Sequence, residues 1–299
     1  MLALLSAVLA YLQATLGGVV RVSGSGEGCQ GWPLCSGRAF PSVDTHALIE
    51  YAHRTNGTVL GLAVLATAVV AWVSFRRQRR IVWLATAALV LVAFEGAVGG
   101  TVVLAELQGV LVMFHFGVAQ VILALLLVLA LSIGVERAGV PDSGMRRLSA
   151  VVAIATYVLL MSGASIVASD AEDSCLAWPL CGTGFQLDAS GLNAFNFVHR
   201  ALVLLVGVLV IYVAAFAWRR CREQRGVRLT AALTVVALML QVAAGAGVAL
   251  SRDSGFFAGL HVALATATWA GMVALTTLFW PGPALRAERS NLALRSQPT

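Results

Sequence analysis

Four of the five histidines in this 299-residue chain form two pairs with the same spacing. They are His53, His115, His199 and His261, and a shift of 146 residues carries the first pair onto the second. Paired imidazoles on facing helices are the axial ligands with which a four-helix bundle holds haem iron. Zinc and copper fit less well, because neither pair brings a third nitrogen or sulfur ligand at helical spacing. The pattern therefore predicts two haem sites; the fifth histidine, His46, has no counterpart and no predicted role.

Carboxylates near the histidines distinguish the two halves of the chain. Glu50 precedes His53 by three residues and so shares its helical face, whereas the equivalent position carries Asn196. Glu95 is likewise replaced by Gln241 after the same shift. A carboxylate beside only one pair of histidines predicts that the two sites have different tasks. Glu50 is the candidate for proton transfer or charge stabilisation, and Glu95 is a secondary candidate.

The composition places these residues in a membrane. The chain is 59% apolar and only 11% charged, whereas an ordinary soluble domain is about 25% charged. The net charge of +6 comes from arginines clustered between long apolar runs, without the aromatic residues and motifs typical of nucleic-acid binding. Such a chain cannot bury its apolar surface in a soluble core, and it is not disordered. We therefore expect a protein of the lipid bilayer with no nucleic-acid partner.

Windows of about 20 apolar residues predict eight transmembrane helices. They cover about residues 2–20, 47–74, 81–103, 110–134, 148–168, 194–217, 229–250 and 257–279. The repeat spans four helices, which return the chain to the side of the membrane where it began. We therefore predict an all-α integral membrane protein made of two tandem four-helix bundles. The halves are residues 1–140 and 141–285, and residues 286–299 form a cytoplasmic tail.

The arginines predict the orientation of these helices, because basic residues gather in cytoplasmic loops. Fifteen of the 20 fall on one side, namely Arg76, Arg77, Arg79, Arg80, Arg137, Arg146, Arg147, Arg219, Arg220, Arg222, Arg225, Arg228, Arg286, Arg289 and Arg295. The opposite loops carry only Arg21, Arg38 and Arg252. Arg54 and Arg200 follow a histidine within helices, where they can bind haem propionates or extend toward the membrane surface. Both termini are therefore expected in the cytoplasm.

Two cysteine pairs obey the same repeat. Residues 29–35 read Cys-Gln-Gly-Trp-Pro-Leu-Cys, and residues 175–181 read Cys-Leu-Ala-Trp-Pro-Leu-Cys. This spacing is not C-x-x-C-H, which excludes covalent c-type haem attachment. On the outer, oxidising side of a bacterial membrane, Cys29 with Cys35 and Cys175 with Cys181 predict a local disulfide in each loop. For the first pair, electron exchange close to a redox site remains a second interpretation.

The order of these motifs resembles the bacterial haem A synthase family. Residues 17–26 read Gly-Gly-Val-Val-Arg-Val-Ser-Gly-Ser-Gly, and the first cysteine loop follows. Residues 49–54 then read Ile-Glu-Tyr-Ala-His-Arg. The resemblance extends over essentially the whole chain, through the eight spans, the four repeated histidines and the paired loop cysteines.

This resemblance implies oxidation of a methyl group on haem O to a formyl group, through a hydroxymethyl haem, to supply haem A to terminal oxidases. It implies a haem b cofactor between His199 and His261. It places the substrate haem O at His53 and His115, with Glu50 as the family's essential carboxylate. Haem O synthase and a membrane electron-transfer protein are the partners that it implies, and the inner membrane of a bacterium is the location that it implies.

Two other functions remain open from the residues alone. A di-haem cytochrome b would use both haems as fixed electron carriers, and a haem transporter or chaperone would bind haem without reacting. Glu50 opposite Asn196 favours the enzyme, because an electron conduit has no need of a carboxylate at only one haem. Glu95 departs from the family, where an amide is expected, so its role is left open.

Overall fold

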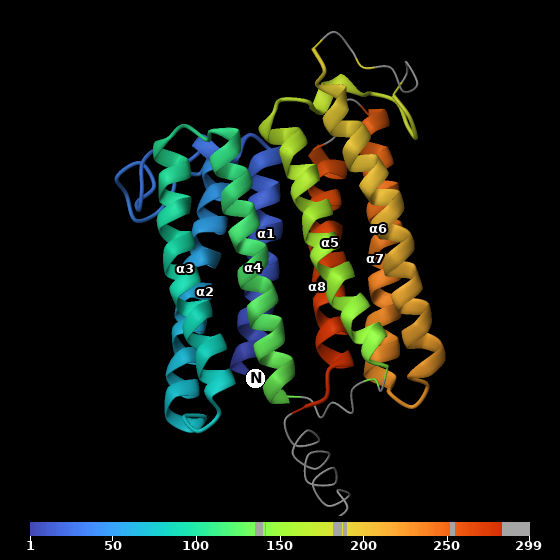
Figure 1. Cartoon of the computed structure of the whole chain (residues 1–299). Helices are drawn as coiled ribbons and strands as arrows, with labels where there is room; N and C mark the ends of the chain where they lie inside the picture. Colours follow the sequence, from blue (N-terminus) through green and yellow to red (C-terminus); the bar gives the residue numbers. More distant parts are fainter. Residues whose placement is uncertain (135–139, 141, 182–186, 188–189, 252–254, 283–299) are drawn as a thin grey trace, which may run out of the picture.

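The protein is a multi-pass membrane protein, and the part of the chain that the structure describes is all-α, with eight helices long and apolar enough to span a bilayer. The computed structural model describes residues 1–134, 140, 142–181, 187, 190–251 and 255–282. The long helices are α1 (Leu2–Val22), α2 (Thr45–Ser74), α3 (Arg79–Leu104), α4 (Gly109–Gly134), α5 (Ser143–Ala168), α6 (Asn193–Arg220), α7 (Arg225–Ser251) and α8 (Gly255–Phe279) (Figure 1). Two short 3₁₀ helices, η1 (Ser25–Glu27) and η2 (Glu172–Ser174), lie in the loops after α1 and α5. The eight predicted spans are confirmed.

Helix α5 begins five residues before its predicted start, and the reason is a local cap. The Asp142 side chain accepts a hydrogen bond from the backbone N–H of Met145 at 3.0 Å, which satisfies a free donor of the first turn. Arg146 and Arg147 lie within the first two turns of the helix, so a search for apolar windows places the start too late. Asp44 caps α2 in the same way through the N–H of Ala47 at 3.1 Å.

The helices pack as two neighbouring groups, α1–α4 and α5–α8 (Figure 1). The groups meet through α1, α4, α5 and α8. Tyr11 on α1 donates a hydrogen bond to the carbonyl of Ala263 on α8, and Tyr157 on α5 donates to that of Gly117 on α4, both at 3.2 Å. Tyr11 and Tyr157 occupy equivalent positions under the 146-residue shift, and so do Gly117 and Ala263. The same hydrogen bond is therefore made twice across the interface, once in each direction.

Equivalent positions also meet directly at the centre of this interface. The Gln120 amide on α4 donates to the Thr266 hydroxyl on α8 at 3.2 Å, and these residues are 146 apart. The indole N–H of Trp269 donates to the Gln120 carbonyl at 3.0 Å. Because these groups are buried, their hydrogen bonds are strong in the low-dielectric interior.

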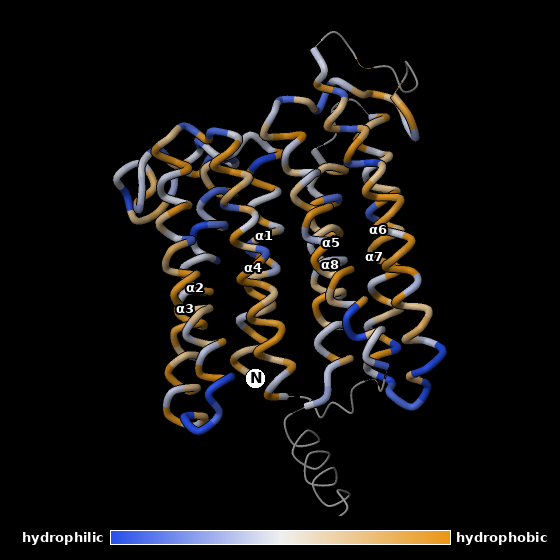
Figure 2. The backbone as a smooth tube through the Cα atoms, in the orientation of Figure 1, coloured by the Kyte–Doolittle hydropathy of each residue, from blue (hydrophilic) through white to orange (hydrophobic). Residues whose placement is uncertain are grey.

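Hydrophobic residues predominate along the helices, and hydrophilic residues are more frequent toward the helix ends and turns (Figure 2). Large aliphatic side chains such as Leu62, Leu204 and Leu233 are more than half exposed, which is the pattern of helices that face lipid. The N-terminus lies at the same end of the molecule as the turns that join α2 to α3 and α6 to α7 (Figure 1). Several predicted features lie outside the described residues: Arg137, Arg252, Arg286, Arg289, Arg295 and the 286–299 tail.

Candidate functional site

The second pair of histidines faces across the α5–α8 group. The rings of His199 on α6 and His261 on α8 have centroids 6.4 Å apart. Two metal–imidazole bonds of about 2 Å, plus about 1 Å from each ring centre to its nitrogen, require a separation of roughly 6 Å. The structure therefore brings this predicted pair to a distance that suits one metal ion between the rings.

Both rings of this pair are anchored through Nδ1. His261 Nδ1 lies 3.0 Å from the backbone carbonyl oxygen of Gln241, which can only accept, so Nδ1 carries the proton. His199 Nδ1 lies 2.9 Å from the Ser162 hydroxyl. That hydroxyl donates its own hydrogen to the Leu159 carbonyl, so it accepts from His199. Each Nε2 is consequently left as a lone-pair donor, which is the form that binds a metal.

Each of the four repeated histidine rings lies against a glycine of a neighbouring helix. The four contacts are Gly17–His53, Gly99–His115, Gly163–His199 and Gly245–His261. A Cβ atom at these glycines would come within 2.9–3.2 Å of the ring carbon Cε1, too close for an unmoved ring. The missing side chains leave space for the imidazoles, and a larger residue would displace them. Gly17 stands in the Gly-Gly motif of residues 17–26, and the 146-residue shift relates the four glycines pairwise, but only the structure shows that they contact the histidines.

The first pair, His53 on α2 and His115 on α4, is held differently. His53 Nε2 lies 3.2 Å from the side-chain nitrogen of Gln13 on α1, while its Nδ1 has no hydrogen-bond partner among the described residues. His115 Nδ1 lies 2.9 Å from Oε1 of Glu95 on α3. The angles at this contact do not fit a hydrogen bond, although the distance is that of an ion pair.

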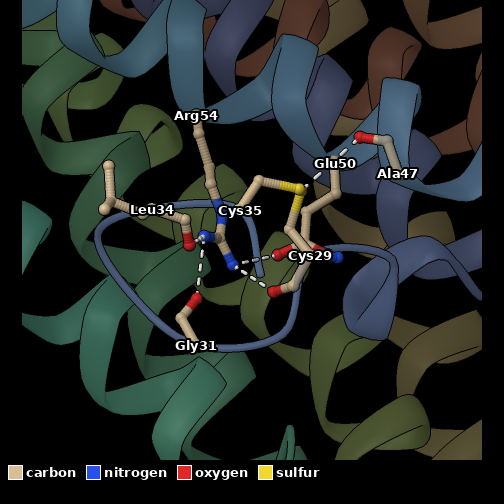
Figure 3. Close-up of polar contacts among 7 residues, drawn as sticks. All are labelled: Cys29, Gly31, Leu34, Cys35, Ala47, Glu50 and Arg54. Atoms are coloured by element: carbon tan, nitrogen blue, oxygen red, sulfur yellow. Dashed lines mark hydrogen bonds and ion pairs between the residues drawn. A yellow bond between two sulfur atoms is a disulfide. The ribbon is translucent and has the colours of Figure 1, made fainter. Parts of the chain in front are cut away.

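Glu50 is directed toward the first cysteine loop and not toward a histidine (Figure 3). Its side chain is almost fully buried, and Oε2 accepts from the backbone N–H of Cys29 at 2.8 Å. Oε1 forms an ion pair with Arg54, one helical turn further along α2. Glu50 is therefore a buried carboxylate with charged and backbone partners, one turn from His53.

Arg54 fastens the same loop onto α2. Its guanidinium donates to the carbonyls of Cys29, Gly31 and Leu34 at 2.9, 2.9 and 3.2 Å (Figure 3). This gives Arg54 a structural task that the sequence analysis did not foresee. A contact between Arg54 and a haem propionate stays a prediction.

The second loop is fastened by the equivalent residues. Arg200 donates to the carbonyls of Cys175, Ala177 and Pro179 at 3.2, 2.7 and 3.0 Å. Asn196 donates from its amide to the Ala171 carbonyl at 2.9 Å. The two loops thus share an arginine anchor and differ at the residue one turn before it. A propionate contact of Arg200 likewise stays a prediction.

Both predicted disulfides are present. Cys29 is bonded to Cys35 and Cys175 to Cys181, and all four residues are buried. Each bond closes a short loop at the end of the helices opposite the N-terminus (Figure 1). Electron exchange through Cys29 and Cys35 stays a hypothesis. His46, which had no predicted role, lies 3.0 Å from the Ser25 hydroxyl and so links η1 to the start of α2.

Comparison with known proteins gives one consistent result. The model of the cytochrome oxidase assembly protein family COX15-CtaA matches residues 1–273. A protein of Symbiobacterium thermophilum named "Heme A synthase" is 33% identical over 279 residues, which cover 89% of this chain and 90% of that protein. Proteins of the same name from Alkalihalophilus pseudofirmus and Bacillus licheniformis are 27% and 28% identical, with 88% and 83% of this chain covered. The two alignments cover 91% and 85% of the length of those relatives.

Proposed function

This chain belongs to the COX15-CtaA family of cytochrome oxidase assembly proteins, and from that premise we propose that it acts as a haem A synthase. The reaction oxidises a methyl group of haem O first to a hydroxymethyl group and then to a hydrated aldehyde, which loses water to give the formyl group of haem A. Relatives named "Heme A synthase" that align over most of this chain support the assignment. The chain is thus a haem-modifying membrane enzyme.

The resident cofactor in this proposal is a haem b held by His199 and His261. The support is their ring separation of 6.4 Å, together with the Nδ1 anchors that leave each Nε2 available to iron. Gly163 and Gly245 have no side chain that would crowd the rings of His199 and His261. When bound, this haem supplies one-electron transfer. The residues of the chain hold it and keep both imidazoles in the correct tautomer.

The substrate, haem O, binds at His53 and His115. The single observation that carries this assignment is the difference in charge between the two sites. Glu50 and Glu95 lie near the first pair of histidines, whereas Asn196 and Gln241 occupy the equivalent positions. Oxidation of the haem methyl releases electrons and a proton; the electrons would leave to the membrane electron-transfer partner, and the Glu50 carboxylate would accept the proton at Oε1 or Oε2 or stabilise positive charge. Arg54 and the Cys29 N–H hold this carboxylate in one orientation.

The orientation that we propose places both termini in the cytoplasm of a bacterial inner membrane. It is supported by the arginines of the turns after α2 and α6, which lie at the same end as the N-terminus. The disulfide loops then face the oxidising compartment, where such bonds persist. Haem O synthase, which makes the substrate, and a membrane electron-transfer protein are the proposed partners.

Haem extraction tests this function. The full chain is purified from cells that make haem O, and its haems are extracted and separated by chromatography. We expect haem b together with hydroxymethyl or formyl haem, and neither modified haem in cells that lack the chain. Haem b as the sole extracted haem would support a di-haem electron conduit and contradict the synthase.

A further inference from the structure

Gln13 on α1 contacts the atom of His53 that iron would bind. Its side-chain nitrogen lies 3.2 Å from His53 Nε2. The Asn56 amide donates to Gln13 Oε1 at 2.7 Å and to the Leu9 carbonyl at 3.1 Å. Because Gln13 Oε1 is the acceptor from Asn56, the NH₂ group of Gln13 points at His53. Gln13 therefore donates to a lone pair on Nε2, the lone pair that a metal needs.

The space for this amide is built into α2. A Cβ atom at Gly57 would lie 3.1 Å from the Gln13 nitrogen, so a larger residue there would crowd the contact. Gln13, Asn56 and Gly57 form a unit that we call the amide clamp. The second half has no such unit, because the equivalent residues are all apolar: Leu159, Leu202 and Val203. Three neighbouring positions thus differ together between the halves.

The two equivalent imidazoles are held by opposite nitrogens. Ser162 binds His199 at Nδ1 and leaves its Nε2 free, whereas the residue equivalent to Ser162 in the first half is Leu16. His53 has no described partner at Nδ1 and is bound at Nε2 by Gln13. Among the described residues, no hydrogen bond competes with a metal for Nε2 of His199. A metal at His53 must displace a hydrogen bond.

We propose that the amide clamp competes with haem iron for Nε2 of His53 and so makes the first site release its haem. This inference rests on the proposed function, in which the first site takes a substrate and returns a product. On release the bond between iron and His53 Nε2 breaks, and the hydrogen bond from Gln13 forms in its place. No electron or proton is transferred in this exchange. The second site lacks the clamp and retains its haem as a cofactor.

Haem transfer to a large excess of haem-free myoglobin measures release without measuring activity. The probe is the full-length protein loaded with haem b at both sites, in its ferric form. We expect a fast phase from the first site and a slow phase from the second. Gln13→Leu, which installs the residue found at position 159, should slow the fast phase about 3- to 10-fold. That factor is what one or two buried hydrogen bonds account for. The slow phase should not change.

Three further variants make the result decisive. Gln13→Ala should slow the fast phase as well, which separates loss of the amide from any effect of the leucine side chain. Thr15→Val is the matched control on α1, because the Thr15 hydroxyl has no hydrogen-bond partner among the described residues; its phases should match the parent protein. His53→Ala should abolish the fast phase and leave the slow phase intact.

Two different results would overturn the inference, and they can be told apart. If His53→Ala removes the fast phase but Gln13→Leu and Gln13→Ala release haem at the parent rate, the clamp does not act and the proposed function stands. If His53→Ala leaves both phases unchanged, no haem depends on the first site. The substrate assignment then fails, and the clamp fails with it.

Discussion

The α1–α4 and α5–α8 groups place equivalent histidines against equivalent glycines but surround them with different polar groups. In the second group both imidazoles are anchored at Nδ1, by a serine hydroxyl and a backbone carbonyl. In the first group one imidazole is bound at Nε2 by Gln13, and the other lies beside the Glu95 carboxylate. The scaffold determines where two haems can sit. In the proposed function, the few residues that differ decide which haem stays and which is changed.

The cysteine loops extend the same comparison to the outer end of the helices. Each loop is closed by a disulfide and fastened by an arginine to three backbone carbonyls. Among the described residues, a buried carboxylate contacts the first loop alone: Glu50 on α2 accepts from the backbone N–H of Cys29. Loop anchoring is thus common to both halves, and the negative charge is specific to one.

Removing an axial histidine should separate the two sites most strongly. His199→Ala or His261→Ala should abolish the low-spin haem b signal, because a bis-histidine site needs both ligands. His53→Ala should keep that signal and lose haem A production. Optical spectra of the purified variants and haem extraction measure the two properties. A full low-spin signal in either second-site variant would refute the cofactor assignment.

The next largest effect is expected at Glu50. Glu50→Gln keeps an acceptor for the Cys29 N–H but removes the charge, so membrane insertion and haem b content should stay near those of the parent protein. Haem A production should fall on the order of 10²-fold or more, the usual contribution of a positioned acid or base. Haem extraction from expressing cells gives the measurement. Asn196→Asp is the matched control in the other half, and wild-type production by Glu50→Gln would rule out a catalytic carboxylate.

A smaller loss, of haem b affinity, is expected when a methyl group is added next to the His261 ring. In Gly245→Ala the new Cβ would lie 2.9 Å from His261 Cε1, so the ring must shift. Overpacking of this kind costs about 1–3 kcal/mol, and a cost in the lower half of that range lowers haem b affinity about 5- to 30-fold. Titration of the haem-depleted protein with haem b measures the change. Gly226→Ala on the same helix is the control, because nothing lies within 4 Å of its Cβ position. Equal affinities in both variants would exclude a role for the glycine.

The smallest effect is expected at Glu95. Glu95→Gln introduces the amide that the equivalent residue of the other half, Gln241, carries. It also removes a negative charge 2.9 Å from His115 Nδ1. The reduction potential of the first-site haem should rise, because the charge no longer favours the oxidised iron, and activity should change less than about tenfold. Spectroelectrochemical titration shows the shift. Gln241→Glu should lower the potential of the second haem, and unchanged potentials in both variants would show that the carboxylate does not influence the metal.

The sequence by itself determined the membrane class, the eight helices, the two histidine pairs and the disulfide loops. Apolar length sets a membrane span, and an ungapped 146-residue shift that preserves histidines, cysteines and an arginine marks equivalent positions. The early start of α5 was not foreseen, because a cap at Asp142 depends on one side chain and leaves no trace in average hydropathy.

Only the tertiary structure decided what each functional group contacts. Glu50 and His53 share a helical face, yet Glu50 is directed to the Cys29 N–H, a partner 21 residues away in the chain. Gln13 and Ser162 carry no motif, and they become partners of His53 and His199 only because α1 packs on α2 and α5 packs on α6. Periodicity within a helix predicts which residues share a face. Which nitrogen of a ring is bound depends on atoms from another helix, and their positions follow from packing.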